Sequence, residues 1–206
     1  KSNELWSIAQ NEQPDGKATL TVLEKTPSDL PLGAITRHPK LPLLFVSTGF
    51  GPNASITTYR IGEDGKLEQI GRIADARGCC YLQTDHAGKH LFSVSHNEPK
   101  VTVFRLSETG LPEAETGTFD TAVPQAHSIA LTPDDRFAYV PHVKGNSRLW
   151  QLAFDPETGT LSPLDPAQVP LDANIGPRHV VRHPTQPWLF FSNEQQLGVS
   201  AYRYDE

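Results

Sequence analysis

The sequence has no methionine and only two cysteines, Cys79 and Cys80, which are adjacent. A disulfide requires well-separated Cα atoms, so adjacent cysteines rarely bridge each other. We therefore expect two free thiols that pack as small apolar side chains. Free thiols are typical of the reducing cytoplasm, which is the predicted location. The absence of methionine, even at residue 1, predicts that the chain is part of a longer protein.

Other absences each exclude a class of protein. No apolar run approaches the ~18 residues of a membrane span, and a net charge of −6 provides no basic face for nucleic acid. The sequence contains neither a glycine-rich phosphate loop nor a G-x-S-x-G nucleophile turn. No group of histidines and cysteines has metal-ligand spacing. We expect no metal, no cofactor, and no nucleic-acid or membrane partner.

A repeated pattern is the main feature that is present. An apolar segment, a turn and a second apolar segment occur four times, as AITRHPKLPLLFVS, CYLQTDHAGKHLFSVS, SIALTPDDRFAYVP and VVRHPTQPWLFFSN. If Pro39, Asp85, Pro133 and Pro184 are the common turn position, the repeats are 46, 48 and 51 residues apart. Four-stranded propeller blades repeat every ~40–50 residues.

Each repeat continues with a third and a fourth predicted strand. Apolar and polar residues alternate in 56–61, 101–106 and 149–154, as in strands with two different faces. Glycine in the turns that follow supplies the positive φ of a hairpin. Helical spacing of apolar residues is nowhere sustained. The sequence therefore predicts an all-β propeller whose blades are four-stranded antiparallel sheets, with strands A to D in order from the channel outward.

The two ends of the chain supply incomplete blades in this scheme. Residues 1–32 give strands C and D of a first blade, 33–78, 79–126 and 127–177 give full blades, and 178–206 begin a last one. Together they form one partial propeller domain, 1–206, of about four blades. Because open sheet edges are hazardous, we expect a fragment of a larger ring rather than a four-bladed ring closed by the two partial blades.

Equivalent positions of the repeat bring reactive side chains together. Six residues before the turn position, at the start of strand A, stand Gly33, Cys79, His127 and Arg178. Glu194, ten residues after Pro184, ends strand B, which is antiparallel to strand A and returns to the same rim. His142 ends strand B of the preceding blade and is expected to reach this rim as a substrate contact. His179 follows Arg178, and alternation points it to the opposite side of the strand.

A histidine, an arginine and a carboxylate on one channel rim have the chemistry of an active site. Histidine exchanges protons near neutral pH, glutamate acts as a base, and arginine binds carboxylate or phosphate with a planar fork. An alternative stays open, in which Arg178 and Glu194 form an ion pair that only ties strand A to strand B, with His127 capping a strand. His38 and His183 precede turn prolines at the other end of strand A, so we interpret them as turn residues.

The segments around these residues resemble a known family. Similar stretches are 126–128 (AHS), 131–136 (LTPDDR), 164–169 (LDPAQV), 176–184 (GPRHVVRHP) and 192–194 (SNE), and the family is that of the seven-bladed lactonase propellers. It includes bacterial propeller-type 6-phosphogluconolactonases and fungal carboxy-cis,cis-muconate cyclases. The resemblance covers nearly the whole chain. It implies a seven-bladed parent fold and a catalytic role for His127, Arg178 and Glu194.

The resemblance also implies a reaction, the hydrolysis of 6-phospho-D-glucono-1,5-lactone to 6-phosphogluconate in the pentose phosphate pathway. His127 or Glu194 is expected to be the general base, and Arg178 is expected to bind the oxyanion or the phosphate of this small anionic substrate. Two alternatives stay open. One is a muconate-type cycloisomerase that uses the same rim, and the other is a non-catalytic propeller scaffold that binds a protein or a metabolite there.

Overall fold

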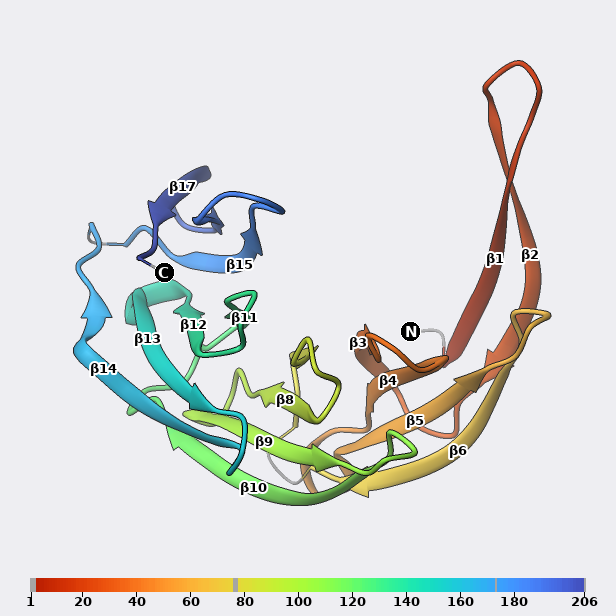
Figure 1. Cartoon of the computed structure of the whole chain (residues 1–206), viewed down its shortest axis with the longest axis horizontal. Helices are drawn as coiled ribbons and strands as arrows, with labels where there is room; N and C mark the ends of the chain where they lie inside the picture. Colours follow the sequence, from red (N-terminus) through yellow and green to blue (C-terminus); the bar gives the residue numbers. More distant parts are fainter. Residues whose placement is uncertain (1–2, 76–77, 173, 206) are drawn as a thin grey trace.

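The computed structural model describes residues 3–75, 78–172 and 174–205, so both ends of the predicted domain, residues 1 and 206, lie outside it. Within these ranges the chain forms five antiparallel sheets, which lie side by side along an arc (Figure 1). In every sheet the hydrogen-bonded order of the strands follows the chain. The prediction of an all-β propeller built from antiparallel blades is therefore confirmed.

We number the sheets as blades I to V in chain order. Blade I is the hairpin of β1 (Glu4–Glu12) and β2 (Ala18–Pro27). Blade II contains β3 (Leu32–Arg37), β4 (Leu43–Thr48), β5 (Ser55–Ile61) and β6 (Leu67–Ala74), with a 3₁₀ turn at Gly51–Asn53. Blade III contains β7 (Tyr81–Thr84), β8 (His90–Val94), β9 (Lys100–Leu106) and β10 (Pro112–Asp120). Blade IV contains β11 (Ala130–Leu131), β12 (Phe137–His142), β13 (Arg148–Asp155) and β14 (Thr160–Val169), with a 3₁₀ turn at Lys144–Asn146. Blade V contains β15 (Pro177–Arg182), β16 (Trp188–Asn193) and β17 (Gly198–Arg203).

Burial differs between the inner and the outer strands of a blade. All residues of β8 are buried, and so are all but the first of β12, because neighbouring blades cover both faces of these strands. Strands β6, β10 and β14 lie on the outer side of the arc (Figure 1) and alternate between half-buried and exposed positions. The second strands of blades III and IV are thus packed on both faces, and the residues at their ends are held in place.

Hydrophobic cores between the blades hold the arc together. The core between blades III and IV contains Phe92, Val140 and Trp150, and the core between blades II and III contains Phe45 and Leu91. Burial of each such side chain contributes about 1.5–3 kcal/mol. No helix in the described part of the chain is long and apolar enough to cross a membrane.

The turns between the first and second strands correct one predicted equivalence. In four blades the same turn residue donates its backbone N–H to the carbonyl that opens the second strand, and these residues are His38, Asp85, Thr132 and His183. Asp85 therefore matches the residues before the turn prolines, and His86 takes the turn position. The spacings from 39 to 86 and from 86 to 133 then both become 47 residues. Six residues before His86 stands Cys80, so the prediction that Cys79 shares the rim position is wrong by one residue.

His38 and His183 are turn residues, as predicted. The Nδ1 atom of His38 accepts hydrogen bonds from the backbone N–H groups of Lys40 and Leu41, at 3.1 and 3.0 Å. Nδ1 of His183 accepts the equivalent pair in blade V. Each imidazole thereby replaces a backbone acceptor and closes the turn before strand B.

Candidate active site

Arg178 and Glu194 meet where β15 begins and β16 ends, as the antiparallel pairing predicts. The backbone N–H of Glu194 donates to the carbonyl of Gly176 at 2.8 Å, which brings the two segments together. Gly176 has a φ of +63°, and a Cβ atom there would lie 1.6 Å from Oε1 of Gln195. A positive φ favours glycine, and any larger residue here would have to displace the Gln195 side chain. Gly176 thus allows the segment after β16 to fold back over the start of β15.

The side chains of Arg178 and Glu194 form an ion pair, with Nε and Oε2 2.8 Å apart. The Nε–H bond finds no hydrogen-bond acceptor in the described part of the chain, so it does not point at the carboxylate. The two side chains are 38% and 37% exposed, and pairs this exposed contribute only about 0–1 kcal/mol. As a tie between strands the pair adds little stability, and both groups are open to a ligand.

A β-bulge at residues 178–179 changes the direction of His179. The register between β15 and β16 shifts between Pro177 and Val180, so alternation breaks at these two residues. The His179 ring contacts the His127 ring, with centroids 5.0 Å apart and planes at 87°. The prediction that His179 points away from the rim residues is therefore wrong, because counting assumed an unbroken strand.

His127 precedes β11 and lies between two other imidazoles. Besides the contact with His179, its ring meets that of His96 from blade III edge-to-face, with centroids 5.7 Å apart. Its Nδ1 atom is buried and has no hydrogen-bond partner among the residues that the structure describes. Burial, together with the nearby Arg178 cation, lowers the pKa of His127 to about 4. The imidazole is thus neutral at pH 7 and can accept a proton.

His142, the predicted substrate contact, is fully buried behind this rim. It ends β12, as predicted, and its Nδ1 lies 3.1 Å from the carbonyl oxygen of Pro124, within hydrogen-bond distance. The imidazole therefore presents no exposed atom to a ligand in this structure. Burial lowers the pKa of His142 to about 4.

The burial of His142 predicts a loss of stability in acid. Its pKa is about 4 in the folded state, against an ordinary value of 6.5, so between these pH values the unfolded chain binds a proton that the folded chain rejects. The contribution of His142 is complete above pH 6.5 and falls by about 3 kcal/mol as the pH drops to 4. Urea unfolding at pH 7 and pH 4.5 measures this loss. His142→Asn, which keeps a donor near Pro124, should show a weaker pH dependence, and an unchanged one would contradict the assignment.

Burial disfavours the thiolate form of both cysteines. Both are free thiols, as predicted, and burial raises the pKa of Cys79 and of Cys80 to about 12. Because the thiolate is the reactive form, we expect a thiol reagent at pH 8 to react on the order of 10³-fold more slowly with the folded protein than with the protein in guanidinium. Fast labelling of native protein in a stopped-flow assay would show that the thiols are accessible and ionised.

His96 is a rim residue that the sequence interpretation missed. With the corrected turn position His86, it stands ten residues on, at the same position in blade III that Glu194 has in blade V. The repeat thus predicts a rim position for His96, but only when blade III is counted from His86 and not from Asp85. Within residues 3–75, 78–172 and 174–205, no three or more His, Cys, Asp or Glu side chains are placed to hold a metal ion.

Comparison with known proteins gives a consistent result. The family model described as "Lactonase, 7-bladed beta-propeller" matches residues 15–206. The 6-phosphogluconolactonase of Cronobacter sakazakii is 33% identical over 192 residues, which are 92% of this chain and 55% of that protein. The 6-phosphogluconolactonase of Klebsiella pneumoniae is 33% identical over 199 residues, or 96% of this chain and 56% of that protein. The chain thus spans about half the length of these relatives.

Solved structures share the fold at lower identity. A Bacteroides fragilis protein superposes with a TM-score of 0.80 at 16% identity, covering 99% of this chain and 65% of that one. The periplasmic gluconolactonase of Pseudomonas aeruginosa superposes with a TM-score of 0.78 at 23% identity, covering 97% and 61%. At these identities the likeness concerns the fold alone.

Proposed function

This chain belongs to the lactonase family of seven-bladed β-propellers, and on that premise we propose that the protein hydrolyses 6-phospho-D-glucono-1,5-lactone to 6-phosphogluconate. The proposal is supported by relatives with this name at 33% identity over most of the chain. The observation that carries the site is the Arg178–Glu194 ion pair, at 2.8 Å and partly exposed, with His127 beside it. We assign catalysis to these three residues.

The chemistry requires a base and an oxyanion partner. A water oxygen attacks the carbonyl carbon of the lactone and gives its proton to the base, the ring C–O bond breaks, and the ring oxygen takes up a proton. Neutral His127 and Glu194 are the two candidate bases. Arg178 stabilises the charge that develops on the carbonyl oxygen, or holds the phosphate of the substrate. Because the Arg178 cation helps to lower the pKa of His127, an anion bound to Arg178 raises that pKa and makes His127 a better base.

Side-by-side assays test this function against its alternatives. Purified protein is given 6-phosphogluconolactone or a carboxymuconate, and the rate is compared with that of the spontaneous reaction in the same buffer. We expect saturable acceleration of lactone hydrolysis only. Turnover of the muconate alone would indicate a cycloisomerase, and no turnover of either substrate would favour a non-catalytic scaffold.

We also place this activity in the cytoplasm, as the free thiols Cys79 and Cys80 suggest. Fractionation of the source cells tests this location, with a cytoplasmic and a periplasmic enzyme as markers. Recovery with the periplasmic marker would contradict it.

A further inference from the structure

The bulge at residues 178–179 takes two backbone groups out of the strand ladder, and both find side-chain partners. The N–H of His179 donates to Oγ of Ser192 on β16, at 3.2 Å. The carbonyl of Arg178 accepts a hydrogen bond from Oγ of Ser128 in the neighbouring blade, at 2.8 Å. Ser128 is fully buried. A carbonyl at a bulge needs a donor from outside the ladder, and the buried Ser128 hydroxyl supplies one here.

Ser128 directly follows His127 in the chain. Its hydroxyl therefore joins the segment that carries His127 in blade IV to the residue that carries the guanidinium in blade V. The equivalent residues of the other blades are Ala34, Tyr81 and His179, none of which has a short hydroxyl side chain. The hydroxyl occurs at the one boundary that separates His127 from Arg178.

We propose that Ser128 is a positioning residue, which fixes Arg178 relative to His127 across the boundary between blades IV and V. The proposal rests on the proposed lactone hydrolysis. Ser128 itself touches no substrate, and it acts through the backbone of Arg178. Without the hydroxyl, the Arg178 carbonyl loses the donor that the neighbouring blade supplies, and this segment shifts. The guanidinium then no longer stands where charge develops on the substrate.

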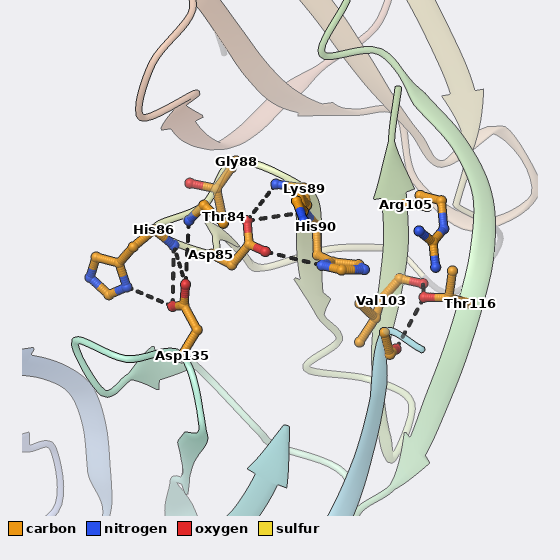
Figure 2. Close-up of polar contacts among 12 residues, drawn as sticks. Thr84, Asp85, His86, Gly88, Lys89, His90, Val103, Arg105, Thr116 and Asp135 are labelled. Carbon is orange, nitrogen blue, oxygen red and sulfur yellow. Dashed lines mark hydrogen bonds and ion pairs between the residues drawn. The ribbon is translucent and has the colours of Figure 1, made fainter. Parts of the chain in front are cut away.

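The test is Ser128→Ala with Thr116→Val as its matched control. Thr116 (Figure 2), on the outer strand β10, also donates a hydroxyl to a carbonyl of the next blade, that of Gly159 at 3.0 Å. We expect Ser128→Ala to lower kcat for the lactone about 10- to 100-fold, since small displacements of a catalytic group have effects of this size. Thr116→Val should keep kcat within about 2-fold, because the Thr116 hydroxyl contacts the carbonyls of Val103 and Gly159, which are not rim residues.

A second measurement does not depend on activity. The charged and titratable groups that face His127 are Arg178, His179 and His96. If Arg178 moves away, the pKa of His127 rises, and an NMR titration of its ring carbon detects this in Ser128→Ala but not in Thr116→Val. Should Ser128→Ala fail to fold, Ser128→Cys, with a weak donor of similar size, is compared in the same way.

The proposal stands if both kcat and the His127 titration change in the Ser128 variant and not in the control. It is overturned if either of them matches the control. Failure of the proposed function is distinct, because the unmodified protein would then hydrolyse no lactone. In that case the His127 titration is the test: a raised pKa in the Ser128 variant supports the positioning role, and an unchanged pKa contradicts it.

Discussion

We expect Arg178→Ala to reduce kcat/KM for 6-phosphogluconolactone by about 10²–10³-fold, the effect of removing a donor that stabilises an oxyanion. The guanidinium is partly exposed and pairs with Glu194 at 2.8 Å. Its positive charge also helps to lower the pKa of His127. Its loss removes the permanent cation of the three assigned catalytic residues. Steady-state kinetics, well below the melting temperature of the variant, measure the effect.

Arg182→Ala is the matched control for this substitution. Arg182 lies on the same strand, β15, and its Nη1 donates to the carbonyl of His183 at 2.8 Å, next to the turn at the other end of the strand. We expect its kcat/KM to be within about 2-fold of the unmodified protein, as is usual for surface changes away from a site. Near-normal activity of Arg178→Ala would show that the Arg178–Glu194 pair is only a tie between strands.

The second large effect is one of stability, and it concerns the buried pair of Asp85 and His90. Both side chains are completely buried, and Oδ2 of Asp85 lies 3.0 Å from Nδ1 of His90 (Figure 2). The other oxygen accepts the backbone N–H groups of Lys89 and His90, at 2.7 and 3.0 Å. Burial by itself raises the pKa of Asp85, but these hydrogen bonds outweigh it, so the pKa lies below its ordinary value.

Asp85→Ala should therefore lower the free energy of unfolding by about 3–5 kcal/mol, because it leaves a buried imidazole and two backbone donors without an acceptor. Asp155→Ala is the control. Asp155 also accepts hydrogen bonds within a turn, from Glu157 and Thr158, but it is exposed. We expect a loss of only about 1 kcal/mol there. If urea unfolding gave equal losses for the two variants, the buried Asp85–His90 pair would stabilise the fold no more than the exposed turn at Asp155 does.

Much of the fold follows from local patterns that the sequence contains. The repeat and the alternation of side chains predict four-stranded antiparallel blades, because each strand has a period of two and each turn needs particular residues. Counting from the turns also predicts that Glu194 returns to the rim where Arg178 begins its strand. Antiparallel pairing alone requires this, and the hydrogen bond from Glu194 to Gly176 agrees with it.

Only the tertiary structure decided the details of the rim. Counting assumes a constant repeat and an unbroken strand, and each assumption failed once. Blade III is shifted by one residue, which puts Cys80 in place of Cys79 and adds His96. The bulge in β15 turns His179 toward His127. The burial of His142 likewise depends on what surrounds the end of β12, and no count along one chain segment contains that information. Position along a strand is a local property, whereas the direction and exposure of a side chain at a blade boundary are set by the packing of two blades against each other.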